Sequence, residues 1–474
     1  MPSIDALREL KTCSARNRCQ AHIKYLRGLS ARTQTSPAIQ HVIKTLQFAL
    51  KKLDSNLAAL ESDPVPPFLD EDQIEATIQF KSGLLIRINA IIGLIDVADI
   101  SGVPGELVAP LRIEIRRQFP DGELIIVPAA ELNYSIVEIT VYLKRLLADL
   151  TCEIPTDLPP KIFRVAIPKV EFDQALLHCI LAHEIGHPLF RELEIEQKVS
   201  PISVGERRIN DLYEQLKATV EKAKPDGTQR ELPFGEVMFK AFVTENVNRI
   251  IPTWVEEIGS DMFGFMTFGP AYVLAFIYFC SSVFRLNSAS ESHPPPRFRI
   301  KTLLDRMEVE FPPEGLGCKT REFLNTWREI ARREPINLNP LQQIALDTIQ
   351  EQGVVDRLYN AIQQSLPDDK RYSKARYAEE VGPLTELIDA MIPPAEILSD
   401  KGYKPTTIPG ILNAGWECFL AGLDKFRECL PEGECNTVFE LNHKFNEFLI
   451  KSMELNQIRR SWDSARNDVI SGKN

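Results

Sequence analysis

One apolar run with a His-Glu-x-x-His motif inside it constrains this chain more than any other stretch. Leu176 to Phe190 reads LLHCILAHEIGHPLF, a pattern typical of a buried helix. Positions four apart share a helix face, so His183 and His187 direct their imidazoles to one point, with Glu184 beside it. Unpaired burial of these groups would be costly, which disfavours a packed amphipathic helix with incidental polar residues. Because neutral imidazole suits zinc, the run predicts a metal site.

A pair of acidic residues further along the chain offers the ligand that this run lacks. Trp254 to Phe265 reads WVEEIGSDMFGF, and its helical pattern places Glu257 and Asp261 on one face. Glu257 can complete a His-His-Glu set, and Asp261 can accept the free ring N–H of a ligand histidine. We prefer Glu257 to Glu256 because only Glu257 has Asp261 one turn away.

A third motif lies in ESHPPPRFRIKTLL, from Glu291 to Leu304. His293 precedes its prolines and Arg299 follows them. On the residues alone, His293 is either a functional residue or a surface loop histidine beside prolines, and Arg299 either supports the site or is a structural ion-pair partner.

Taken together, the three motifs resemble those of the gluzincin zinc metallopeptidases, of which thermolysin is the familiar case. The order HExxH, ExxxD and H-P-P, with Arg-Ile six residues after the histidine, is most similar to the heat-shock-protease and prenyl-endopeptidase family. The resemblance covers roughly residues 161–304, and the flanking regions match no family that we can name. It implies a zincin-type core with a small β-sheet.

The resemblance also implies a role for each residue of the motifs. The zinc ligands would be His183, His187 and Glu257. Glu184 would be the general base that takes a proton from metal-activated water, and His293 would donate to the tetrahedral oxyanion. Asp261 and Arg299 would contact the ligand side chains without binding the metal and would fix their orientation.

Two functions follow from these motifs. The first is a zinc-dependent metallopeptidase that hydrolyses a peptide or protein substrate. The second is a regulatory or binding protein whose metal site is structural or whose groove is occluded. No pattern in the sequence selects a substrate, endo- or exopeptidase action, or an oligomeric state.

Composition limits the partners and the compartment. The net charge of −11 argues against a general nucleic-acid binder, because a phosphate-binding surface needs surplus Lys and Arg. Residues 1–62 hold ten Lys and Arg against four Asp and Glu, which indicates either a basic patch or, as we prefer, a solvated helical hairpin. Nine cysteines without paired spacing, and no apolar region typical of a signal peptide, predict a cytoplasmic protein.

Hydrophobic periodicity predicts a mainly α (α+β) chain in four parts. These are an N-terminal helical hairpin (1–62), a mixed accessory region (68–160), the catalytic core (161–310) and a C-terminal helical region (318–474). The prolines of 63–67 mark the first boundary. Phe163 to Ile167 predicts a strand, either an edge strand that pairs with extended substrate, as we prefer, or an ordinary internal strand.

The uncharged run from Met262 to Phe284 has 23 residues, enough to span a bilayer by length alone. Gly269 and Pro270 interrupt it, and it directly follows Glu257 and Asp261, which must reach a water-filled site. We therefore expect a buried helix pair and no membrane span, unlike in the membrane-embedded members of the family.

The metal helix should begin near Phe172 or Asp173. It should kink or stop just past His187, because Pro188 cannot donate to the carbonyl four residues earlier. Gly186 leaves room for a neighbouring backbone to pass close.

Overall fold

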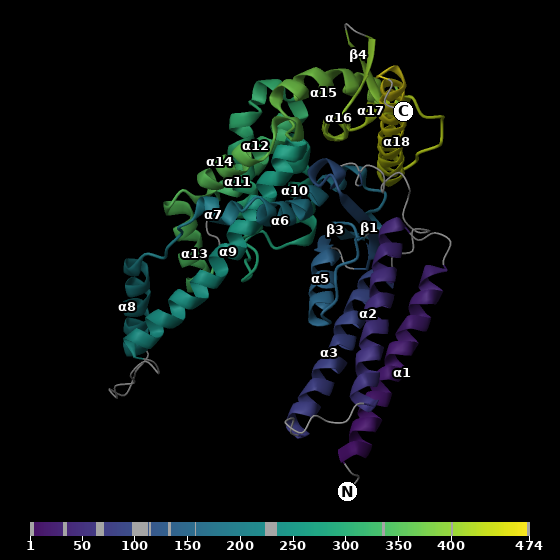
Figure 1. Cartoon of the computed structure of the whole chain (residues 1–474). Coiled ribbons are helices and arrows are strands. Elements are labelled where there is room, and N and C mark those ends of the chain that lie inside the picture. Colours follow the sequence, from purple (N-terminus) through teal and green to yellow (C-terminus); the bar gives the residue numbers. More distant parts are fainter. Residues whose placement is uncertain are drawn as a thin grey trace. The chain divides into compact units, whose positions relative to one another are not determined.

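The computed structural model describes residues 4–31, 36–62, 71–96, 112, 115–130, 134–156, 158–222, 235–333, 337–399 and 402–471. The chain divides into two compact units, Met1–Phe172 and Asp173–Asn474. Both are dominated by helices, which confirms the mainly α expectation (Figure 1). The linker expected at 63–67 lies outside the described residues.

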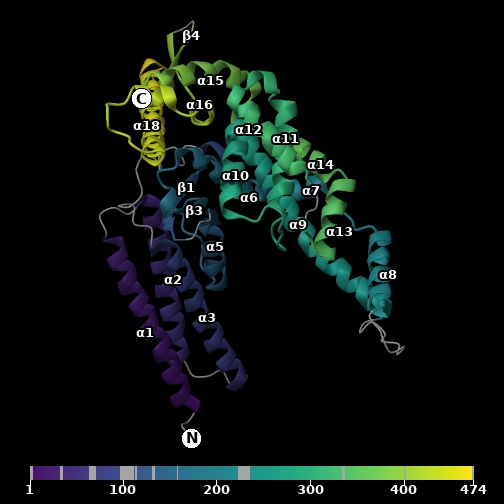
Figure 2. The same cartoon turned by 180° about the vertical axis from the view of Figure 1, so that it is seen from behind.

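The first unit combines long helices with a small sheet. Its helices are α1 (Ile4–Ser30), α2 (Pro37–Ser62), α3 (Glu71–Asp96) and α5 (Ile139–Asp149), followed by a 3₁₀ turn at Lys169–Glu171. Three of them, α1, α2 and α3, lie side by side in both views (Figure 1 and Figure 2). Glu75–Asp96, in α3, is the one described helix that is long and apolar enough to cross a membrane, by length and composition only.

The sheet of this unit corrects the prediction for Phe163 to Ile167. Its strands are β1 (Gly122–Ala129), β2 (Ser135–Glu138) and β3 (Lys161–Pro168), in the order β1-β3-β2. β3 pairs with β1 in parallel and with β2 antiparallel, so both of its edges are occupied. The edge-strand prediction is therefore wrong, because β3 has no free edge beside β1 and β2 for a substrate. Its alternative, an internal strand, is correct.

The second unit carries the three motifs and the rest of the chain. Its helices up to the third motif are α6 (Leu181–Glu192), α7 (Ile195–Val199), α8 (Glu206–Lys222), α9 (Glu236–Phe268), α10 (Pro270–Val283) and α11 (Pro296–Glu310). Further on lie α12 (Cys318–Arg332), α13 (Pro340–Glu351), α14 (Val354–Ser365), α15 (Lys374–Asp389), α16 (Ile408–Ala421), α17 (Asp424–Glu428) and α18 (Val438–Ser471). A two-stranded ribbon joins β4 (Glu396–Ser399) to β5 (Gly402–Pro405), and 3₁₀ turns lie at Ala175–Ile180, Pro313–Gly315 and Asp368–Lys370.

The uncharged run forms two largely buried helices, as predicted. α9 ends at Phe268, and Gly269, at φ +62°, lets α10 begin at once with Pro270. The side chain of Asn413 bridges this break, because its oxygen accepts from the N–H of Ala271 at 2.8 Å and its nitrogen donates to the carbonyl of Phe268 at 2.8 Å. The backbone groups freed by the break are thereby satisfied within the core.

The helix that carries His183 and His187 begins later and ends later than predicted. Residues 175–180 form a buried 3₁₀ turn packed against α10, α16 and α18, so α6 begins at Leu181 and not near Phe172 or Asp173. Tertiary packing has overridden the local helical pattern there. α6 then continues through Pro188 to Glu192, although the proline cannot donate to the carbonyl of Glu184.

Candidate metal centre

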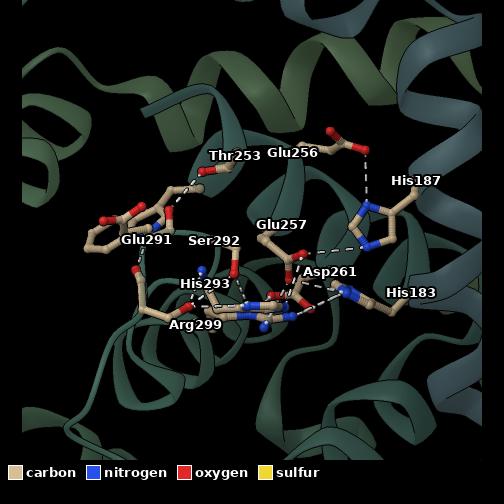
Figure 3. A network of polar contacts seen from close by, with 12 residues as sticks. His183, His187, Thr253, Glu256, Glu257, Asp261, Glu291, Ser292, His293 and Arg299 are labelled. Carbon is tan, nitrogen blue, oxygen red and sulfur yellow. Dashed lines mark hydrogen bonds and ion pairs between the residues drawn. The ribbon is translucent and has the colours of Figure 1, made fainter. Parts of the chain in front are cut away.

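Three predicted ligands meet at one point between two helices (Figure 3). His183 and His187 come from α6 and Glu257 from α9, and one donor atom from each lies within 4.8 Å of the others. Nε2 of His183 lies 3.4 Å from Oε2 of Glu257, and Nε2 of His187 lies 3.5 Å from Oε1. Motifs separated by about seventy residues of sequence thus supply two imidazoles and one carboxylate to a common centre.

Small residues bring the two helices close enough for this convergence. A Cβ added to Gly186 would lie 2.7 Å from Cα of Ser260, so the backbone of α9 passes directly against it, as predicted. At Gly259 an added Cβ would lie 2.6 Å from the ring of Phe190. Both contacts are closer than any side chain allows, so glycine sets how near α6 and α9 approach.

Asp261 supports His183 from the buried side. Oδ1 of Asp261 lies 3.1 Å from Nδ1 of His183 and accepts a 2.6 Å hydrogen bond from the hydroxyl of Tyr272. Arg299 donates to both carboxylate oxygens, through Nε at 2.7 Å and Nη2 at 2.8 Å. Gly264 makes room for the ring of Tyr272, since an added Cβ would lie 2.4 Å from it.

Arg299 links this support to the ligand carboxylate. Its Nη1 lies 3.2 Å from Oε2 of Glu257, and its guanidinium carbon lies 4.7 Å from the centre of the Phe276 ring. An arginine in such a place is paired on its edges and covered on one face. The structure thus places Arg299 at the candidate metal centre. Its ion pairs with Asp261 and Glu257 also fit the alternative prediction that Arg299 is a structural ion-pair partner.

These contacts govern the protonation of the site. Burial alone would lower the pKa of His183, but its bonds to Asp261 and Glu257 raise that pKa to about 10. Burial would raise the pKa of Asp261, yet the Arg299 guanidinium holds it well below its usual range. Against the same effect of burial, His183 and Arg299 lower the pKa of Glu257 to about 2. Both carboxylates are therefore anionic near neutral pH, and His183 carries a proton that a bound cation would have to displace.

Glu184 lies next to His183 and has a different environment. Burial raises the pKa of Glu184. The charges of His183 and His187 lower that pKa, and the charge of Glu257 raises it. Within the described residues, no hydrogen bond or ion pair engages its carboxylate. A carboxylate with a raised pKa and no fixed partner is suited to accept a proton.

His293 lies at the same centre, on the loop between α10 and α11. Its Nε2 is 3.5 Å from Oε1 of Glu257, and its side chain is 58% exposed. Its Nδ1 lies 2.8 Å from Oγ of Ser292, which leaves Nε2 free to point at the ligands. Thr253 anchors this loop to α9 by donating to the carbonyl of Glu291 at 3.0 Å (Figure 3).

Sequence reasoning missed four contributors: Glu256, Tyr272, Phe276 and Ser292. The sequence offers Glu256 only as a rival ligand to Glu257, whereas Oε1 of Glu256 lies 3.1 Å from Nδ1 of His187. The hydroxyl of Tyr272 offered one signal, because a buried tyrosine hydroxyl needs a partner. No motif marks the other two.

The donor set fits zinc. Two imidazole nitrogens and one carboxylate are the ligands of a catalytic zinc site. Oε2 of Glu257 is buried and, within the described residues, makes ion-pair contacts but no hydrogen bond. Comparison with protein-family models, curated proteins and solved structures found no match for this chain. The geometry therefore carries the functional argument by itself.

Proposed function

We propose that this chain is a zinc-dependent metallopeptidase with a gluzincin-like catalytic core in its second unit. The observation that carries the proposal is the convergence of His183, His187 and Glu257 beside Glu184, a carboxylate without a fixed partner. The centre offers three protein donors among the described residues, whereas structural zinc sites use four. This count favours a catalytic role over a structural metal in a binding protein.

Each side chain has a task in peptide hydrolysis. Zinc, when bound by the three ligands, supplies Lewis-acid polarisation of the scissile carbonyl. Glu184 accepts the proton of the attacking water and returns it to the leaving amine. His293, with Nε2 directed at the centre, donates to the oxygen that becomes negative in the transition state. Asp261 and Arg299 hold His183 in place.

The proposal includes a cytoplasmic setting and a peptide or protein substrate. All nine cysteines are free, which supports a reducing compartment. The net charge of −11 supports a protein without a nucleic-acid partner.

The first test separates the metal from the chemistry. Protein purified without chelator should hold about one zinc per chain, because one three-ligand set is present. Glu184→Gln should keep that zinc while cleavage of a fluorescently labelled unfolded protein falls by at least ~10²-fold, since the amide cannot accept the proton. Metal analysis and a fluorescence assay measure the two quantities.

Glu192→Gln is the matched control, because Glu192 is exposed at the end of the same helix. It should change neither zinc content nor rate. Wild-type protein that folds without zinc would contradict the site, and zinc-loaded Glu184→Gln that cleaves at the wild-type rate would contradict the mechanism. Zinc-loaded wild type that cleaves nothing would favour a binding protein.

A further inference from the structure

The imidazole of His187 lies between two consecutive glutamates of α9. Its Nε2 is 3.5 Å from Oε1 of Glu257, and its Nδ1 is 3.1 Å from Oε1 of Glu256 (Figure 3). Successive residues of an α-helix point about 100° apart. Glu256 and Glu257 therefore approach the ring from different directions and contact opposite nitrogens.

The backbone that carries His187 has less support than that of a regular helix. Pro188 has no N–H, so the carbonyl of Glu184 lacks its usual donor within α6. Nε of Arg191 donates to the carbonyl of His187 at 3.3 Å and lies 4.0 Å from Oε1 of Glu256.

The two ligand histidines thus have separate carboxylate partners. Asp261, whose side chain is 2% exposed, faces Nδ1 of His183, and Glu256, at 31%, faces Nδ1 of His187. A metal-bound histidine commonly donates its other ring N–H to a carboxylate, which fixes the tautomer and the ring orientation. The contact of Glu256 has that geometry.

We infer that Glu256 is a positioning residue for His187: its carboxylate accepts a hydrogen bond from Nδ1–H, which leaves the Nε2 lone pair for the metal. The inference rests on the metal centre proposed above and adds a member that the ExxxD motif does not contain. Glu256 acts through a hydrogen bond, so an amide at the same position should retain much of the effect. The charge alone should contribute less, because Glu256 is partly exposed to water.

Zinc affinity of the full chain, measured by competition with a chromophoric chelator, tests this role. Glu256→Ala should weaken zinc binding by about 10–100-fold, the usual loss for such a partner. Glu256→Gln should retain most of the zinc affinity that Glu256→Ala loses, because its amide oxygen still accepts the hydrogen bond from Nδ1 of His187. Glu245→Ala is the matched control, an exposed glutamate of the same helix, and should bind zinc like wild type.

The visible spectrum of the cobalt-substituted protein supplies a readout that general destabilisation does not change. Glu256→Ala should alter the ligand-field bands, while Glu245→Ala and Glu256→Gln keep them close to wild type. If Glu256→Ala fails to fold, Glu256→Leu takes its place, since it retains side-chain volume without an acceptor.

Wild-type affinity and spectrum in the variant without an acceptor would overturn the inference and leave the metal centre intact. Glu256→Gln as weak as Glu256→Ala would overturn it too, because the charge and not the hydrogen bond would then be responsible. Wild-type protein that binds no zinc would remove the proposed function, and the inference with it.

Discussion

The two sides of the candidate metal centre differ in burial. On one side, Asp261 and Arg299 have side chains only 2% and 8% exposed, and Tyr272 is buried against them. On the other side, His293 is 58% exposed and Glu184 is half-buried. Ion pairs cost more to break where water cannot replace them. The buried side should therefore determine stability and ligand geometry, and the open side should determine the rate.

The largest effect on folding should come from Arg299. Arg299→Leu leaves the anionic Asp261 buried without its main partner, so the free energy of unfolding should fall by about 3–5 kcal/mol. Urea denaturation followed by circular dichroism measures the change. Lys301→Ala is the control on the same helix, since its exposed ion pair with Asp305 should contribute less than about 1 kcal/mol. If both variants lost the same free energy of unfolding, the buried side of the centre would not determine stability more than an exposed ion pair does.

His293 tests the open side. His293→Ala should lower the cleavage rate by about 10²–10³-fold, the loss expected for an oxyanion donor, while zinc content and the unfolding midpoint stay at wild-type values. His443→Ala, at a partly exposed histidine of α18, should change none of the three. A His293→Ala protein that unfolds more easily but cleaves at the wild-type rate would show that His293 contributes to stability and not to catalysis.

The crossing of α6 and α9 should give the smallest of the three effects. Gly186→Ala forces a Cβ to 2.7 Å from Cα of Ser260 and should cost about 1–3 kcal/mol of unfolding free energy. Gly93→Ala is the control, because its added Cβ meets nothing within 4 Å at an exposed position of α3. It should stabilise the protein by roughly 0.5–1 kcal/mol. Destabilisation of the same size in both variants would argue against a steric limit at the crossing.

The sequence was informative where the chemistry depends on spacing within one helix. His183 and His187, four residues apart, and Glu257 and Asp261, also four apart, keep their relations in any regular helix. That Gly186 needs a close neighbour was also readable, because glycine in a helix interior has a cost that packing must offset. The convergence of α6 and α9 then places these residues at one centre.

Features that depend on tertiary contacts could not be predicted as well from the sequence. The strand pattern at 163–167 is the same for an edge strand and for a central one, and only pairing with β1 and β2 distinguishes them. The start of α6 moved to Leu181 because buried packing imposed a 3₁₀ turn before it. The partners of His187 and Asp261, namely Glu256 and Tyr272, follow from how side chains meet in space, which no local spacing encodes.

The close crossing of α6 and α9 also bears on how related chains should be recognised. A search pattern built only from chemical groups would keep the histidines and acids and leave the intervening positions open. Here, positions 186 and 259 tolerate no Cβ without displacing a neighbour, although neither residue carries a functional group. A more diagnostic pattern is therefore H-E-x-G-H combined with E-x-G-S-D, in which the glycines and Ser260 specify how closely the helices approach. The histidines and acids of the pattern specify the candidate ligands, the proposed general base and the partner of His183.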